Sequence, residues 1–307
     1  MKKSIKRLIL LTLIAGLAVA AALAWYATRP QGDGVLPKTV HVTPGMHLQA
    51  LTAHLEEAGA VDNPLLFRLL ARALGKGHHI KVGVYTLDRP LSPLQLLDKF
   101  ERGEVTQMSV LFVEGWNLRQ VRAALAAQTL LRQDSAQMSD RELALAIGVE
   151  DGKLEGRLFP DTYFYAPHSS DLDVLRRAYR LQTQKLQAAW ETRAPDLPYR
   201  TPYEALIMAS IVEKETGAPA ERARVAGVFV NRLRLGMRLQ TDPTVIYGMG
   251  ESFDGNLRRV DLQRDTPFNT YTRGGLPPTP IAMPGEAAIR AALHPEKTEA
   301  LYFVSRG

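Results

Sequence analysis

Residues 203–217 read YEALIMASIVEKETG, and this stretch predicts a buried helix around which the second half of the chain is organised. Thr201 can cap the helix, and Pro202 suits its first turn. The run from Ala205 to Val212 holds only small or apolar residues, so most of the helix circumference should be buried. Gly217 offers a left-handed stop after the last turn.

Two glutamates near the end of this helix are the candidate chemical groups. Residues three and four positions earlier lie on the same helical face. For Glu215 those positions hold valine and isoleucine, whereas for Glu213 they hold serine and alanine. Desolvation raises the pKa of a carboxyl and keeps it able to donate a proton near neutral pH. We therefore expect Glu215 to be the acid, with Glu213 orienting the site or replacing it; the alternative is two solvated charges at a helix end.

The composition is that of a globular protein with about two domains, since 307 residues are 46% hydrophobic. The formal net charge is +6, but the first seven residues contribute four of these charges and no aromatic-basic motif follows, so no nucleic-acid partner is expected. The absence of cysteine excludes disulfides and thiolate metal sites. The pair His78-His79 lacks a third ligand nearby, and no nucleotide-binding fingerprint occurs, so neither a metal nor a cofactor is expected.

An uncharged segment at residues 8–27 has about the 20 residues that a helix needs to cross a bilayer. Basic residues precede it, and Trp25 and Tyr26 stand at its far end like an interfacial anchor. This pattern predicts a single-pass protein of the inner (cytoplasmic) membrane, with a cytoplasmic N-terminus and everything after Arg29 periplasmic or extracellular. The alternative is a cleaved signal peptide.

The remaining periodicities predict an α+β fold. Residues 1–29 form the cytoplasmic tip and transmembrane helix, 30–38 a linker, 39–110 a compact α+β module, and 111–307 a mixed α/β domain built around the buried helix. Strands are expected at 39–43, 81–87, 106–113 and 301–304. Helices are expected at 47–58, 64–75, 93–103, 117–125, 128–149, 171–190, 220–234 and 285–293, besides the central one.

Loops rich in hydroxyl, amide and aromatic groups follow the central helices, and such loops on a helical scaffold often carry substrate contacts. The candidate substrate-binding residues there are Thr241, Asp242, Tyr247, Asn269 and Tyr271. The alternative is that these are ordinary surface loops. A further candidate, Asp161, lies in the aromatic segment at 155–165.

Four segments of the chain resemble one known family. They are EGRLFPDTYFY (155–165), ASIVEKETG (209–217), NRLRLGMRLQTDPTVIYG (231–248) and NTYTRGGLPPTPIAMPG (269–285). Together they closely resemble the endolytic murein transglycosylase family (MltG, YceG-like), and the resemblance extends from residue 39 onward. It implies that the 39–110 module is LysM-like and that the 111–307 domain is catalytic.

The resemblance also implies an activity, namely cleavage of nascent peptidoglycan strands between N-acetylmuramic acid and N-acetylglucosamine, which can terminate glycan polymerisation during wall assembly. Partners would be peptidoglycan, the membrane through residues 8–27, and wall-synthesis proteins such as penicillin-binding proteins of the divisome or elongasome. Lytic transglycosylases of other families place the catalytic glutamate directly before Ser or Thr, and Glu215-Thr216 looks like that pair. Family members usually continue with a segment carrying His, Phe and Asn, so we expect this sequence, which stops at Gly307, to be truncated or to lack that part of the site.

Such an enzyme needs one acid, because the 6-hydroxyl of the muramic acid attacks its own C1 and forms a 1,6-anhydro ring. A lysozyme-like hydrolase is the alternative, and it normally uses two carboxylates. Asp161 and Asp242 are the candidates for that second carboxylate. A non-catalytic glycan-binding scaffold is the remaining alternative.

Overall fold

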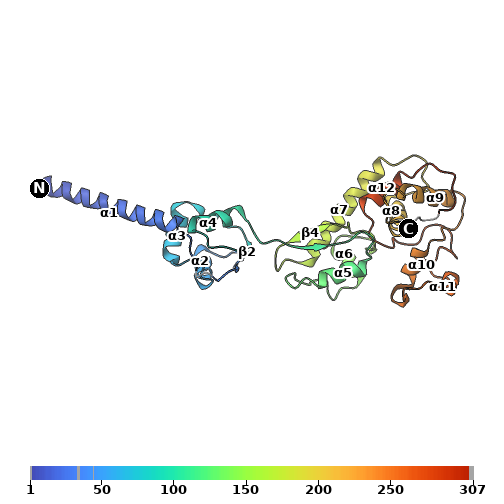
Figure 1. Cartoon of the computed structure of the whole chain (residues 1–307), viewed down its shortest axis with the longest axis horizontal. Coiled ribbons are helices and arrows are strands. Elements are labelled where there is room, and N and C mark those ends of the chain that lie inside the picture. The colour runs from blue at the N-terminus through green and yellow to red at the C-terminus, as the bar shows by residue number, and fades with distance from the viewer. Residues whose placement is uncertain (1, 33–34, 44, 304–307) are drawn as a thin grey trace. The chain divides into compact units, whose positions relative to one another are not determined.

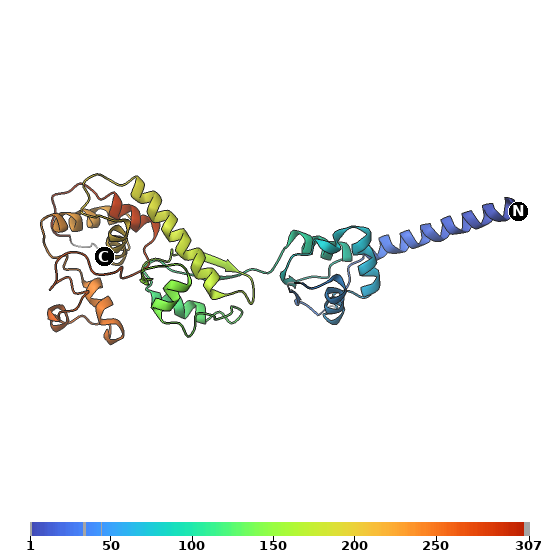
Figure 2. The same cartoon turned by 180° about the vertical axis from the view of Figure 1, so that it is seen from behind.

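The structure, a computed structural model, describes residues 2–32, 35–43 and 45–303, except for the side chains of 2–9, 12 and 78. Its internal contacts divide the chain into two units, Met1–Met108 and Ser109–Gly307. Figure 1 labels the elements, and Figure 2 shows them from behind. Helices and two small two-stranded sheets confirm the predicted α+β class.

The first unit has a core between one antiparallel strand pair and three helices. Strand β1 (Lys38–Val42) pairs with β2 (Gly83–Leu87), and the helices are α2 (Leu48–Glu57), α3 (Pro64–Ala73) and α4 (Pro93–Arg102), with the 3-10 turn η1 (Lys76–His78) after α3. Every second residue of β1 is buried, as one-sided packing requires. Side-chain caps from Asn63 and Ser92, each followed by proline, start α3 and α4 where the sequence predicts them.

Helix α1 (Lys2–Thr28) enters this unit through its last turn, which packs against α3 and α4. Tyr26 and Ala27 are buried in the core, and the Tyr26 hydroxyl donates to the carbonyl of Asn63 at 2.8 Å. The prediction that Tyr26 is an interfacial anchor is therefore wrong, because protein surrounds its ring; Trp25 is 62% exposed. Among the residues that the structure describes, none of the helices has the length and apolar character of a membrane span. The predicted span at 8–27 includes positions whose side chains lie outside the described part.

The beginning of the predicted linker is packed onto the first unit. The Gln31 backbone N–H donates to the carbonyl of Leu91 at 3.0 Å, and its side-chain oxygen accepts from the Asp62 N–H at 2.9 Å. Only 5% of Gln31 is exposed. Gln31, within the predicted linker, is therefore packed onto the first unit, while residues 33–34 lie outside the described part of the chain.

The second unit begins with β3 (Met108–Leu111), which pairs with β4 (Thr162–Tyr165). Its helices, in chain order, are α5 (Leu118–Ala126), α6 (Asp140–Ala146), α7 (Asp171–Glu191), α8 (Pro202–Glu215), α9 (Arg222–Arg234), α10 (Asp242–Met249), α11 (Arg259–Gln263) and α12 (Glu286–Leu293), with the 3-10 turn η2 (Gly250–Ser252) after α10.

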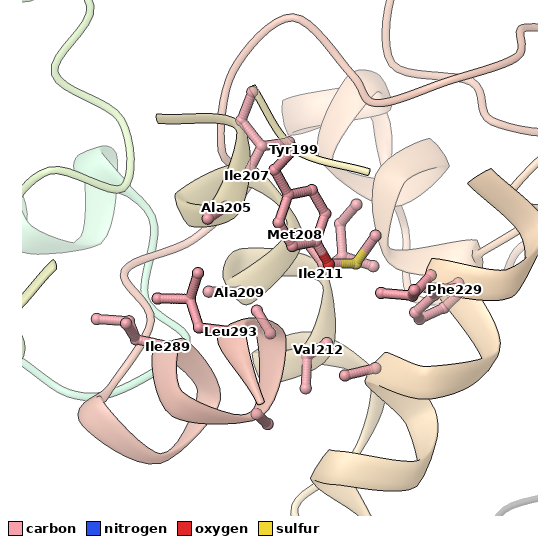
Figure 3. Close-up of a cluster of buried hydrophobic side chains, with 14 of the residues drawn as sticks. Tyr199, Ala205, Ile207, Met208, Ala209, Ile211, Val212, Phe229, Ile289 and Leu293 are labelled. Carbon is pink, nitrogen blue, oxygen red and sulfur yellow. The ribbon is translucent and has the colours of Figure 1, made fainter. Parts of the chain in front are cut away.

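Helix α8 lies at the centre of this unit, and α7, α9 and α12 pack against it. All residues from 205 to 212 are buried, as predicted, and Figure 3 shows several of them meeting Phe229, Ile289 and Leu293. Thr201 caps the first turn by accepting a hydrogen bond from the Glu204 N–H at 3.2 Å. Burying so much of one helix fixes the position of its C-terminal turn, which carries both candidate glutamates.

Three local predictions are wrong, each because a tertiary or side-chain contact replaces the expected backbone pattern. Gly217 does not adopt the left-handed conformation; the chain leaves α8 through an extended Thr216. Within the predicted 128–149 helix only α6 forms, since the buried carboxylate of Asp171 holds the Ser135 hydroxyl at 2.6 Å in the preceding turns. Residues 301–303 form no strand, because the Arg232 side chain takes the carbonyl of Leu301; residue 304 lies outside the described part.

Candidate active site

Glu215 lies where the C-terminus of α8 meets the N-terminus of α10. The Thr241 hydroxyl donates to Glu215 Oε2 at 2.8 Å. Burial raises the pKa of Glu215; the Thr241 hydrogen bond and the charge of Arg232 oppose this shift, and the charge of Asp242 adds to it. No ion pair reaches Glu215 within the described residues. The site therefore holds a carboxyl whose protonated form is favoured, with one donor available to stabilise the carboxylate.

Thr241 is held by its own surroundings. Only 1% of it is exposed, and its N–H donates to the Thr270 hydroxyl at 3.1 Å, while Thr244 donates to its carbonyl at 2.8 Å. The preceding residue, Gln240, has a φ of 50°, a conformation that costs free energy in a non-glycine residue. These contacts fix the direction of the hydroxyl toward Glu215.

Asp242 and Tyr271 form a second polar pair beside Glu215. The Tyr271 hydroxyl donates to Asp242 Oδ1 at 2.5 Å. Burial, followed by the Asp242 carboxylate, raises the pKa of Tyr271. The structure thus brings together Glu215, Thr241, Asp242 and Tyr271, all four of which the sequence predicts as site residues.

Glu213 has a different set of partners. Arg222 Nη2 donates to Glu213 Oε1 at 3.0 Å, and the N–H of Gly285 donates to Oε2 at 2.9 Å. Only 4% of the Glu213 side chain and 11% of the Arg222 side chain are exposed. Burial raises the pKa of Glu213, while the Gly285 amide and the Arg222 charge lower it. Glu213 therefore ties α8 to α9 and to the start of α12, and its carboxylate is occupied.

The expected reason for preferring Glu215 is incomplete. The face argument makes Glu215 the desolvated acid, yet burial raises the pKa of both glutamates. The two glutamates differ in their partners. The guanidinium of Arg222 lies 3.0 Å from the Glu213 carboxylate, whereas Glu215 accepts a hydrogen bond from the neutral Thr241 hydroxyl.

A cleft of about 660 Å³ adjoins this end of α8. One wall is the start of α5, from Asn117 to Gln120, and another is α10 with Pro243 and Tyr247. Glu215 itself is not among the lining residues, but its neighbour Lys214 is. The cleft therefore reaches the last turn of α8 through Lys214, and is of the size that small-molecule sites occupy.

Glu155 is a cleft residue that sequence reasoning missed. Both of its oxygens accept from the Leu118 N–H at 3.2 Å, and Oε2 also accepts from the Tyr247 hydroxyl at 3.0 Å. Burial raises the pKa of Glu155 to about 7. The aromatic segment 155–165 already stands out in the sequence. Nothing in the local pattern, however, shows that Glu155 is buried while the nearby Asp161 is exposed.

The YceG-like family model matches residues 40–307. The chain belongs to the YceG-like family. An endolytic murein transglycosylase of Bacillus subtilis is 29% identical over 291 residues, covering 89% of this chain and 80% of that protein. A Streptococcus pneumoniae protein with the same name is 28% identical over 94% of this chain, which spans only 59% of that relative. A YceG-like protein of Listeria monocytogenes has a crystal structure with a TM-score of 0.57 and 28% identity, covering 87% of this chain and 93% of that one.

Asn269 has a structural role in this YceG-like chain. Its side-chain amide donates to the carbonyls of Leu262 and Arg264 at 3.0 and 2.7 Å, and its oxygen accepts from the Tyr271 N–H at 2.8 Å. None of Asn269 is exposed. Asn269 therefore ends α11 and positions the loop that carries Tyr271, and its direct contact with substrate stays a prediction.

Asp161 is not brought to the other candidates. It is exposed immediately before β4, and its Oδ1 accepts from the Thr162 N–H at 2.7 Å. No hydrogen bond or ion pair between Asp161 and Glu215 occurs in the described part of the chain. The side chains that the structure describes also contain no cluster of three or more metal-binding groups.

Proposed function

We propose that this chain is an endolytic murein transglycosylase, which cuts peptidoglycan strands between N-acetylmuramic acid and N-acetylglucosamine and leaves a 1,6-anhydro end. The observation that carries the proposal is Glu215, a buried carboxyl of raised pKa in the helix turn that a large cleft adjoins, bonded to Thr241 and without an ion-pair partner in the described structure. Membership of the YceG-like family and the names of its bacterial relatives support the same activity.

The reaction follows from a single acid that donates a proton and then recovers one. Protonated Glu215 gives its proton to the glycosidic oxygen as the bond to muramic acid C1 breaks. The Thr241 hydroxyl then stabilises the new carboxylate through its hydrogen bond. The carboxylate removes the proton from the 6-hydroxyl of the same sugar, and that oxygen closes on C1. No water is consumed, and Glu215 ends protonated for the next cycle.

The structure of the product tests this function. Soluble fragments released from un-crosslinked glycan strands are analysed by mass spectrometry. A transglycosylase gives 1,6-anhydro-muramic ends, which are lighter by one water than the reducing ends of a hydrolase. Reducing ends alone would replace the transglycosylase by a hydrolase.

The lysozyme-like hydrolase remains the second candidate because the charge of a second carboxylate, Asp242, contributes to the raised pKa of Glu215. The Tyr271 hydroxyl already binds Asp242, and no hydrogen bond or ion pair joins Asp161 to Glu215 in the described part of the chain. A hydrolase would need Asp242 to activate water or attack C1.

The hydrogen bond from Thr241 predicts a pH effect. Because this bond lowers the pKa of Glu215, we expect Thr241→Val to raise that pKa further. Activity requires protonated Glu215 and is lost as pH rises through the folded pKa. The alkaline limb of the pH–rate profile should therefore move to higher pH, while the maximal rate falls. A Thr241→Ser variant, which keeps the hydroxyl, should follow the wild type; an unmoved limb in Thr241→Val would contradict the assigned acid.

We further propose that residues 8–27 anchor the chain in the inner membrane, with the N-terminus cytoplasmic, the 39–110 module LysM-like, and the catalytic domain facing the wall together with wall-synthesis proteins. Large apolar side chains of α1, including Leu10, Leu13 and Leu17, are more than half exposed, which suits a lipid surround. Alkaline carbonate extraction of membranes tests the anchor: release of the chain into the soluble fraction would contradict it.

A further inference from the structure

Two side chains in the cleft wall form a pair that the proposed chemistry does not use. Glu155 lies in the loop before β4, and Tyr247 lies on α10, 92 residues further along the chain. The Tyr247 hydroxyl donates to Glu155 Oε2 at 3.0 Å. Both residues line the cleft beside α8. The ring of Tyr247 is held edge-on to Phe268, with 4.8 Å between ring centroids, so the hydroxyl has a fixed place in the wall.

The partners of Glu155 restrict where its proton can go. As a carboxylate, it accepts from both the Leu118 N–H and the Tyr247 hydroxyl. As a neutral acid it has a proton to donate, but the Leu118 N–H has no lone pair to receive it. The Gly156 N–H, its other backbone partner, cannot receive a proton either. The remaining partner is the oxygen of Tyr247, which then turns its own hydrogen toward another acceptor.

We propose that Glu155 is a positioning residue which determines, through Tyr247, whether the cleft wall offers a hydrogen-bond donor to a sugar. The ligand group is the acetamido carbonyl of an N-acetylated sugar, because a carbonyl oxygen can only accept. With Glu155 neutral, the Tyr247 hydroxyl donates its hydrogen bond to that carbonyl; with Glu155 charged, the same hydroxyl donates to the carboxylate of Glu155 instead. The inference rests on the proposed function for the identity of the ligand.

The ionisable surroundings place this change near neutral pH. Burial raises the pKa of Glu155 to about 7, and the Leu118 and Tyr247 bonds oppose the shift. Burial and the Glu155 charge raise the pKa of Tyr247, so the phenol keeps its proton throughout. The other charged residues of the cleft are Arg119, Asp140, Lys214 and Glu251.

Those other charges are already engaged. Arg119 pairs with Glu251 at 2.9 Å, and Lys214 donates to the carbonyl of Gly115 at 3.3 Å. Asp140 pairs with Arg122 at 2.8 Å, and its charge acts on Glu155 only as a smaller contribution that raises the pKa. Glu155 is the cleft residue whose pKa burial raises to about 7.

Binding without turnover tests the proposal. The full chain carrying Glu215→Gln binds a soluble N-acetylated glycan oligomer, and calorimetry gives its Kd across the neutral range. With Glu155 present, we expect Kd to rise roughly three- to tenfold as pH increases through about 7, because the sugar then loses one hydrogen bond from Tyr247. Adding Glu155→Gln should fix Kd at the low-pH value, since the amide donates to Tyr247 and still accepts from Leu118. Adding Tyr247→Phe should give the weaker Kd at every pH.

An exposed glutamate at the end of α7 supplies the control: Glu191→Gln should leave the pH dependence of Kd unchanged. Carboxyl carbon NMR gives a second readout, because removing the Tyr247 bond should raise the pKa of Glu155. Thermal unfolding checks that each variant folds. A Kd that does not change while Glu155 titrates overturns the proposal, as does a Tyr247→Phe variant that keeps the pH dependence. Neither result bears on the proposed transglycosylase, which the product analysis tests separately.

Discussion

Glu215→Gln is expected to leave the chain folded and to reduce release of anhydro-muropeptides by about a thousandfold. The amide occupies the same space and can still accept the hydrogen bond from Thr241, so packing at the end of α8 is preserved. It has no acidic proton to give to the glycosidic oxygen. Mass spectrometry of soluble fragments, with time courses for both forms, measures the loss.

The control for this variant lies on the same helix. Glu204 is in the first turn of α8 and accepts from the Arg200 N–H, so Glu204→Gln changes the same functional group far from the cleft. It should retain wild-type rates. Full activity of Glu215→Gln would remove Glu215 from the mechanism.

Glu213→Gln should affect stability first, lowering the free energy of unfolding by about 3 kcal/mol. The amide can still accept from Gly285 but cannot neutralise Arg222, whose Nε already has no hydrogen-bond partner in the described structure. Urea unfolding followed by tryptophan fluorescence measures the change. Activity assayed well below the unfolding midpoint should be largely retained.

A double variant separates charge from packing. Glu213→Leu with Arg222→Met removes both charges and keeps apolar volume, so it should recover part of the stability that Glu213→Gln loses. If Glu213→Gln is instead as stable as the wild type and inactive, Glu213 and not Glu215 is the acid.

Local sequence was sufficient to predict α8. Its cap at Thr201, its proline and its unbroken apolar run all act within a few residues of one another, and the structure follows them. The choice between the two glutamates was a different problem. The guanidinium that occupies Glu213 comes from nine residues further on, and the amide of Gly285 from 72 residues further on. No periodicity carries that information. The preference for Glu215 rested on its helical face, which explains only part of the difference, and on the resemblance of Glu215-Thr216 to the pair of other lytic transglycosylases.

The same limit explains the residues that were missed or misassigned. Burial raises the pKa of Glu155, and its hydrogen-bond partners, which oppose this shift, lie 37 and 92 residues away. Asn269 is typical of a polar loop residue in sequence, yet the carbonyls at the end of α11 take its amide. Helix 128–149 failed because a buried aspartate in the next helix organises the turns before α6. The contacts of Glu155 and of the turns before α6 join segments that are distant in sequence, whereas the partners of Asn269 lie within eight residues of it.

The burial of Tyr26 and Ala27 has a mechanical consequence for the first unit. Because the last turn of α1 belongs to the same core as β1 and α4, and Gln31 is bonded to Leu91 directly after it, no swivel separates the helix from the folded module. A tilt of α1, or its rotation about its own axis, must therefore move the whole module with it as one rigid body. Any surface that holds α1 therefore also determines the distance and the orientation of the module relative to that surface.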